Sequence, residues 1–392
     1  MKEAIITHPS LNRAGGAERV CISTIKALRD GGYKVKLFTI EKTDWHNLKF
    51  RFGETAKPYE ERFLIKHVPG RDELSQALSI VPLYLSMLMY NKTKHNFMIN
   101  TQGDLVSTIA DICYVNAVPQ RIAYQYSLNK HQNFSWMRVS AKAYDLYLRA
   151  VEKVFKNNIL LVNSNFTRKV VKRYLRRDSI IVYPPVEVDE FRRTEDFNDR
   201  EDIIVTTARF RKWKHLNIIP KIAKLVGTGR FIVMGIVDEA SNQVVEELKK
   251  AIQALGVSNR IQLLINQPRK RYLEVLKSAK VYLHTQPMEA FGISIVEAMA
   301  SGCIPLVPQN GGPWLDILDC KQGVYGFSYS SISEAAAIIT KILKSEQLRR
   351  GITLNATRKA QEFSSTNFEK RMLKIVNYIY KCKNHFNSTL SK

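Results

Sequence analysis

The 392-residue sequence contains few cysteines, and none of them has the spacing of a metal or redox site. The five cysteines are scattered through the chain and form no C-x-x-C pair, the spacing used by zinc ribbons and thiol oxidoreductases. An odd number of distant cysteines also argues against a disulfide framework. We therefore expect small core residues of a protein in a reducing compartment.

A long hydrophobic run is also absent. The most apolar stretch, Ser79–Tyr90, is much shorter than the roughly 20 residues that a helix needs to cross a bilayer. The first residues, MKEAIITHPS, lead into a strand-like pattern without the apolar segment and cleavage site of a secretory signal. We expect neither secretion nor a transmembrane helix. Ser79–Tyr90 is either a buried helix or a hydrophobic ridge that contacts a membrane or a lipid acceptor.

Acidic residues are outnumbered, because 36 Asp and Glu stand against 60 Lys and Arg and leave a formal net charge of +24. A field of this strength attracts polyanions. Nucleic acid, an anionic membrane surface and phosphorylated substrates all fit as partners. A hydrophobic fraction of 45% supplies enough apolar area for real cores, so we expect an ordered globular protein.

The length predicts two domains of ordinary size. Short β-branched runs alternate with helical patterns twice along the chain, which is typical of βαβ units and parallel sheets. The first set of strands is expected at 4–8, 34–40, 96–100, 112–116, 159–164 and 180–183, and the second at 203–208, 230–235, 260–265, 281–285, 304–307 and 325–329.

The boundary is expected in Tyr183–Phe191, where two consecutive prolines forbid helix and stiffen the chain. This places an amino-terminal Rossmann-like domain at residues 1–186 and a carboxy-terminal one at 187–365. The last residues, 366–392, have apolar positions at helical spacing and few partners nearby in the sequence. We expect this helix to pack back onto the first domain.

Two glycines follow the first expected strand. Gly15 and Gly16 precede a helical pattern, so their backbone can approach a ligand closely and their amides can face an anion at a helix start. The alternative is an ordinary tight turn between strand and helix, since the spacing is not the G-x-G-x-x-G of dinucleotide enzymes.

A cationic loop follows the first strand of the second set. The segment ARFRKWKHLN places Arg209 and Lys214 at the carboxyl end of a parallel strand, where open α/β sheets bind ligands. A leaving diphosphate needs fixed positive charge, which these side chains can supply. The alternative is a solvated surface.

The most specific constellation lies in residues 284–313. Glu289 and Glu297 are eight residues apart, with Glu289 before an expected helix and Glu297 inside it. The amides at the helix start can bind a phosphate, and the carboxylates, which would repel it, suit hydroxyl groups instead. The alternative is an amphipathic helix with exposed acids. The residues expected at this phosphate-binding helix start are Phe291, Gly292, Ile293 and Ser294.

Together these segments resemble a known family. The stretch E-A-F-G-I-S-I-V-E resembles the two-glutamate motif of retaining family 4 glycosyltransferases, and the later N-G-G-P is similar to its continuation. Arg209 and Lys214 match the family's R-x-x-x-x-K pair. The segments G-G-A-E-R and N-S-N-F-T also resemble family patterns, and all matches occur in the family's order.

The resemblance implies an α/β protein of GT-B fold, in which two Rossmann-like doubly wound domains face each other across a cleft. It implies that Glu297 binds the donor ribose, that Glu289 binds the transferred sugar, and that Arg209 with Lys214 binds the diphosphate. The glycine loop would close over the phosphates or the acceptor. No metal and no cofactor are implied beyond the substrate, a GDP- or UDP-linked sugar.

One position departs from the mannosyltransferases of lipid-linked oligosaccharide assembly. Many of these have histidine after Y-V, where this chain has Asn116, which can bond a sugar hydroxyl but cannot act as acid or base. The resemblance thus implies transfer of a hexose of mannose or glucose type, with retention, to a lipid-linked glycan or other oligosaccharide. The identity of the sugar stays open.

A basic helix is expected after N-S-N-F-T, with cations on one half and apolar residues on the other. Its basic half either lies on an anionic membrane, where each nearby cation contributes about 1 kcal/mol, or keeps a basic protein soluble. The first interpretation predicts a cytoplasmic protein that is peripheral at the cytosolic face of a membrane. The cations are Arg168, Lys169, Lys172, Arg173, Arg176 and Arg177.

Two other functions stay open. A non-enzymatic nucleic-acid-binding protein would use the same basic surface, but the sequence has no recognisable nucleic-acid-binding module and that function leaves the two-glutamate helix unexplained, so we expect no nucleic acid partner. A phosphorylase or epimerase could share the fold, because fold does not determine reaction.

Overall fold

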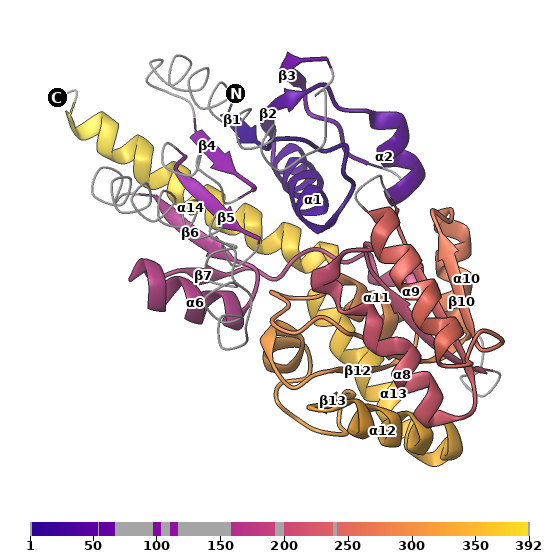
Figure 1. Cartoon of the computed structure of the whole chain (residues 1–392). Helices are drawn as coiled ribbons and strands as arrows, with labels where there is room; N and C mark the ends of the chain where they lie inside the picture. Colours follow the sequence, from indigo (N-terminus) through magenta and orange to yellow (C-terminus); the bar gives the residue numbers. More distant parts are fainter. Residues whose placement is uncertain are drawn as a thin grey trace. The chain divides into compact units, whose positions relative to one another are not determined.

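The computed structural model describes residues 2–53, 55–66, 97–102, 110–116, 158–192, 200–237 and 241–390. The chain divides into two compact units (Figure 1), Met1–Pro184 with Thr366–Lys392 as unit 1, and Pro185–Ser365 as unit 2. The division falls between the two prolines of the expected boundary segment. Ser79–Tyr90 lies outside the described residues, among which no helix is long and apolar enough to cross a membrane.

Unit 1 is built on a seven-stranded sheet with the order β3-β2-β1-β4-β5-β6-β7, in which every pairing is parallel. Its central strands are buried on both faces, as in Ala4, Ile5 and Ile6 of β1, because helices cover both sides of a parallel sheet. The strands are β1 (Lys2–Thr7), β2 (Tyr33–Glu41), β3 (Glu60–Ile65), β4 (Phe97–Asn100), β5 (Ile112–Val115), β6 (Ile159–Val162) and β7 (Ile180–Ile181).

The last helix of the chain completes unit 1. Phe368, Met372 and Val376 are spaced by four residues, so they share one face of α14 and enter the core around β1 and α1. Figure 1 shows this yellow helix running along the strands of unit 1. The return of the final helix to the first domain is thus confirmed. The helices among the described residues of unit 1 are α1 (Gly16–Asp30), α2 (Trp45–Phe52), α6 (Asn165–Leu175) and α14 (Ser365–Leu390).

Unit 2 is built on a six-stranded parallel sheet with the order β10-β9-β8-β11-β12-β13. The strands are β8 (Glu201–Thr207), β9 (Arg230–Gly235), β10 (Ile261–Ile265), β11 (Ala279–Leu283), β12 (Ile304–Pro308) and β13 (Phe327–Tyr329). The helices are α7 (Val188–Phe191), α8 (Ile219–Val226), α9 (Asn242–Ala254), α10 (Arg269–Ser278), α11 (Ile293–Ala300), α12 (Ile332–Lys344) and α13 (Glu346–Ala360), with short helical turns at Lys212–Lys214, Leu216–Ile218, Pro313–Ile317 and Gln361–Phe363.

Each sheet has a point where the strand order reverses direction. In unit 1 this point lies between β1 and β4, and in unit 2 it lies between β8 and β11. Successive crossovers leave opposite faces of the sheet there, and ligands of doubly wound folds bind at the carboxyl ends of the two strands that flank such a point. The expected α/β fold with two doubly wound parallel sheets is confirmed.

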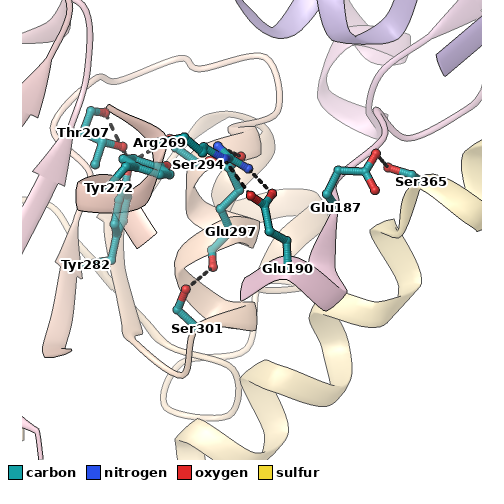
Figure 2. Close-up of polar contacts among 10 residues, drawn as sticks. All are labelled: Glu187, Glu190, Thr207, Arg269, Tyr272, Tyr282, Ser294, Glu297, Ser301 and Ser365. Atoms are coloured by element: carbon teal, nitrogen blue, oxygen red, sulfur yellow. Dashed lines mark hydrogen bonds and ion pairs between the residues drawn. The ribbon is translucent and has the colours of Figure 1, made fainter. Parts of the chain in front are cut away.

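The segments at which the chain enters and leaves unit 2 are hydrogen-bonded to each other. The backbone of Val186 accepts a hydrogen bond from the amide of Ser365 at 2.9 Å, and Val186 pairs with Ser364 in a parallel bridge. The hydroxyl of Ser365 also donates to Oε1 of Glu187 at 2.6 Å (Figure 2). Both connections to unit 1 therefore start from one small hydrogen-bonded cluster.

Candidate functional site

The site in unit 2 begins with a cationic loop at the reversal point of the sheet. Arg209 follows the end of β8 and is exposed, while Lys214 lies further along the loop, in the turn Lys212–Lys214. The hydroxyl of Thr285, just after β11, donates to the carbonyl of Lys214 at 2.6 Å. This bond ties the loop after β8 to the loop after β11, so both expected diphosphate ligands follow β8 on the ligand-binding side of the sheet.

Glu289 lies beside Lys214. Its Oε2 accepts a hydrogen bond from Nζ of Lys214 at 2.8 Å, and the two side chains are 20% and 22% exposed. Burial alone would raise the pKa of the Glu289 carboxyl, but the ammonium of Lys214 and the nearby His284 outweigh it and lower that pKa below its ordinary value. Glu289 is therefore an anion that contacts a cation beside the loop that follows β8.

His284 is a part of this site that the sequence did not indicate. It follows β11, is buried, and places Nε2 3.9 Å from Oε2 of Glu289. Burial lowers the pKa of its imidazole to about 4, with Lys214 acting in the same sense and Glu289 against it. His284 is consequently neutral near pH 7 and can donate or accept a hydrogen bond without bringing charge.

The N-G-G-P segment packs against the loop that carries Glu289 and is hydrogen-bonded to it. The amide of Gly312 donates to the carbonyl of Glu289 at 2.8 Å, and the side chain of Asn310 accepts from the amide of Met288. A Cβ on Gly312 would lie 2.1 Å from the carbonyl oxygen of Ala290, a distance that real Cβ atoms essentially never show. Glycine is required here because two backbones meet.

Glu297 lies in α11, is 4% exposed, and meets two donors from α10 (Figure 2). The hydroxyl of Tyr272 donates to its Oε2 at 2.5 Å, and Nη1 of Arg269 lies 3.6 Å from its Oε1. A buried carboxylate needs such partners, since an unpaired charge in a protein interior is costly. The acid expected to bind the donor ribose is thus held inside unit 2, not exposed on a surface helix.

Some residues at the start of α11 pack in the core of unit 2, and others present polar groups. Phe291 is buried edge-to-face against Phe363, with ring centres 5.3 Å apart, so only its backbone is placed to reach a ligand. Gly292 has φ 101°, a conformation that favours glycine, and Ile293 begins the helix. The hydroxyl of Ser294 accepts from that of Tyr282 at 2.7 Å (Figure 2).

The glycine loop of unit 1 is capped from within its own helix. Gly15 is the N-cap of α1, and its amide donates to Oε2 of Glu18 at 2.7 Å. Oε1 of the same buried carboxylate lies 3.8 Å from Nε2 of His8, at the end of β1. The amide of Gly15 is thus already engaged by an acid, while Gly16 begins the helix.

Asn116 follows β5 of the same sheet. Its side-chain amide donates to the carbonyl of Thr101 at 2.5 Å, and its own carbonyl accepts from the side chain of Asn163. These bonds join the loops after β4, β5 and β6. Asn116 therefore lies at the carboxyl edge of the sheet of unit 1.

Arg269, Tyr272, Glu190 and His284 are further site residues that sequence reasoning missed. Arg269 and Tyr272 are three residues apart at the start of α10, a spacing that puts them on one side of a helix and could have been noticed. Nothing in the sequence connects them to Glu297. Their pairing depends on how α10 and α11 pack.

Comparison with known proteins agrees with this geometry. Residues 187–359 match the glycosyl transferases of group 1. Unit 2 therefore carries the signature of that family over most of its length. The two-unit fold matches HepE of Anabaena, solved in complex with UDP and glucose, with a TM-score of 0.72, 18% identity, and coverage of 96% of this chain and 100% of that one.

The chain is a glycosyltransferase with the GT-B fold. It is 26% identical to the GDP-Man:Man(3)GlcNAc(2)-PP-Dol alpha-1,2-mannosyltransferase of Dictyostelium discoideum, over 94% of this chain and 83% of the relative. The enzyme of the same name from Xenopus tropicalis is 31% identical, with 55% of this chain and 47% of the relative aligned. The chain thus spans about half the length of several relatives. The expected GT-B fold and the expected glycosyltransferase activity are confirmed.

Proposed function

We propose that the glycosyltransferase moves mannose from GDP-mannose to a lipid-linked oligosaccharide, with retention of anomeric configuration. The names of the relatives at 26% and 31% identity support this donor and acceptor. The observation that carries the proposal is the contact between Lys214 and Glu289 at the reversal point of the unit 2 sheet. This contact supports a role for Lys214 as the cation that binds the diphosphate and for Glu289 as the anion that binds sugar hydroxyls.

The chemistry of this proposal is stabilisation of a leaving group. The bond from the anomeric carbon to the diphosphate would break as the acceptor oxygen bonds to that carbon on the same face, and the acceptor hydroxyl would give its proton to the departing diphosphate, on which negative charge grows. Lys214 and Arg209, with the amides at the start of α11, would stabilise that charge, since fixed donors act strongly where water is excluded. Glu289 would accept hydrogen bonds from the sugar and Glu297 from the ribose.

We propose that no metal ion takes part, because the cationic side chains supply the positive charge that the diphosphate needs. The measurement is turnover after treatment with a chelator and again after addition of Mg²⁺ or Mn²⁺. Equal turnover in all three states is expected. A loss that is restored by the added ion would contradict the proposal.

We also propose that unit 1 lies on an anionic membrane at the cytosolic face through α6. Val170 and Val171 of this helix are buried, while most of its cations are exposed. Binding to anionic vesicles should therefore be strong at low salt and fall as salt screens the charges. The double variant Arg168→Glu/Lys172→Glu should lose it, and Lys221→Glu/Lys224→Glu, on the exposed face of α8 in unit 2, should keep it.

The donor is tested by a thermal-shift panel of GDP, UDP, GDP-mannose and UDP-glucose, because a ligand of the native state raises the melting temperature. The largest shift is expected with GDP-mannose. Product analysis with a lipid-linked glycan then separates transfer from phosphorolysis or epimerisation. A salt-dependent gel shift with nucleic acid and no shift with any nucleotide would favour the nucleic-acid-binding alternative.

A further inference from the structure

Two side chains of α10 converge on one carboxylate of α11. Arg269 and Tyr272 lie on the same side of α10, and both point at Glu297 (Figure 2). The hydroxyl of Tyr272 reaches Oε2 of Glu297 at 2.5 Å, and a guanidinium nitrogen of Arg269 lies 3.6 Å from the other oxygen. Tyr272 thus hydrogen-bonds one oxygen of the carboxylate, while the positive charge of Arg269 lies near the other.

Both donors keep their protons. Burial raises the pKa of the Tyr272 hydroxyl well above its ordinary value, and the charge of Glu297 raises it further, so the hydroxyl remains a donor. Burial alone would lower the pKa of Arg269, but its hydrogen bonds to Glu190 and the charge of Glu297 raise it. A carboxylate has about four lone-pair positions, so accepting the bond from Tyr272 is compatible with accepting others.

Arg269 is itself fixed by a second acid. Its Nε and Nη2 donate to the two oxygens of Glu190 at 3.1 and 2.6 Å, which is the bidentate geometry that holds a guanidinium in one orientation. The guanidinium also lies over the ring of Phe191, 4.8 Å from its centre. Glu190 belongs to α7, directly after the segment where the chain enters unit 2.

We infer that Tyr272 and Arg269 are positioning residues for the nucleotide of the donor. They hold the Glu297 carboxylate in the orientation that accepts hydrogen bonds from the ribose hydroxyls, and Glu190 holds Arg269 in place for this task. The inference rests on the proposed role of Glu297 in ribose binding. It predicts an effect confined to the ribose, while the base and the phosphates bind as before.

The experiment compares each nucleotide with its 2′-deoxy form. Calorimetric titration of GDP and 2′-deoxy-GDP, and of UDP and 2′-deoxy-UDP, gives the preference for the ribonucleotide in each protein. The wild-type preference is expected to be about tenfold or more, because a hydrogen bond to a charged group is lost in the deoxy form. Tyr272→Phe and Arg269→Lys should each reduce this preference by about three- to tenfold and leave affinity for the deoxy form unchanged.

Two further variants complete the set. Glu190→Gln should reduce the preference in the same direction, because it weakens the bidentate pair. Tyr329→Phe is the matched control, since this tyrosine of unit 2 donates to the carbonyl of His284 and not to Glu297. Its preference should equal that of the wild type. Glu297→Ala defines the preference that remains when the acid is absent.

The outcomes separate the inference from the proposed function. If Glu297→Ala keeps the full preference, or the wild type binds no nucleotide, the ribose role itself is wrong and the inference falls with it. If Glu297→Ala loses the preference while Tyr272→Phe and Arg269→Lys keep it, only the positioning role is overturned. Equal losses for the ribo and deoxy forms in these two variants would indicate a merely structural role and would also overturn it.

Discussion

Nζ of Lys214 lies 2.8 Å from Oε2 of Glu289, although 75 residues separate them in the sequence. The contact exists because β8 and β11 are neighbours in the sheet and both loops leave its carboxyl edge. A lysine ammonium has three donors, so Lys214 can keep this bond and still donate to a phosphate. The pair therefore links the group that would stabilise the leaving diphosphate to the group that would hold the sugar.

Removing either cation should slow transfer strongly. We expect Lys214→Ala and Arg209→Ala each to reduce turnover by about a hundredfold or more, because a preorganised donor to developing charge is lost. The melting temperature should change little in Arg209→Ala, because that side chain is exposed, and should fall somewhat in Lys214→Ala, because Glu289 loses its cation. The matched control is Lys224→Ala, at an exposed position of α8, which removes the same charge from unit 2 and should leave turnover unchanged. Near-normal turnover in both loop variants would refute the assignment.

The contact itself predicts coupling between its two members. Glu289→Ala should damage turnover about as much as Lys214→Ala, and the double variant should lose less than the product of the single losses, because residues in contact are not additive. The measurement is a double-mutant cycle on kcat/KM. Independent, multiplicative losses would mean that the two residues act on the reaction separately.

Much of the fold was predictable because its signals are local. Every strand expected from the sequence is present, and the paired prolines at Pro184 and Pro185 coincide with the division between the units. β3 was missed because it is an edge strand of unit 1 whose residues are partly or fully exposed, so it lacks the apolar run that marks the central strands. The apolar runs that predicted the strands therefore reflect burial of the central strands, not an intrinsic preference of their residues for strands.

The candidate site was predictable only where its members share a motif. Glu289 and Glu297 lie in one short segment, and Arg209 and Lys214 lie in another. The donors to Glu297 come from α10, and Glu190 comes from α7, so their convergence depends on helix packing that no local pattern records. His284 was also missed, because a single histidine after a strand does not reveal from the sequence whether it is buried or which residues it contacts.

Acid should destabilise unit 2 through His284. The unfolded chain binds a proton at this side chain below its ordinary pKa of 6.5, but the folded chain does so only below about 4. Between these values the unfolded state holds more protons, so the free energy of unfolding falls as the pH drops through this window, by up to about 3 kcal/mol. The lowered pKa of Glu289 acts in the same sense, because its contribution is lost as the pH falls through the folded value.

The test of this acid sensitivity is urea denaturation at several pH values from about 7 to about 4. His284→Asn should flatten the dependence, because the replacement carries no proton that folding must expel. His46→Asn, on an exposed position of α2 in unit 1, is the matched control and should keep the wild-type slope. The same slope in His284→Asn and the wild type would show that other groups cause the acid lability.

The backbone contact between Gly312 and the Glu289 loop leaves no room for a methyl group on Gly312. A Cβ on Gly312 would lie 2.1 Å from the carbonyl oxygen of Ala290, so Gly312→Ala must displace one of the two backbones. Such overpacking typically costs about 1–3 kcal/mol of stability. Turnover should fall by about a hundredfold if the Glu289 loop moves by roughly 1 Å, since catalytic geometry is sensitive on that scale.

Gly351→Ala, in the same unit, should stabilise the protein instead of destabilising it. This glycine lies in α13, where an added Cβ would meet no neighbouring group of the described residues within 4 Å. Alanine should therefore raise the free energy of unfolding by about 0.5–1 kcal/mol through better helix propensity, and turnover should not change. Denaturant midpoints and turnover of the two variants are compared directly. A Gly312→Ala protein as stable and active as Gly351→Ala would mean that the loop carrying Glu289 is not held by the backbone contact.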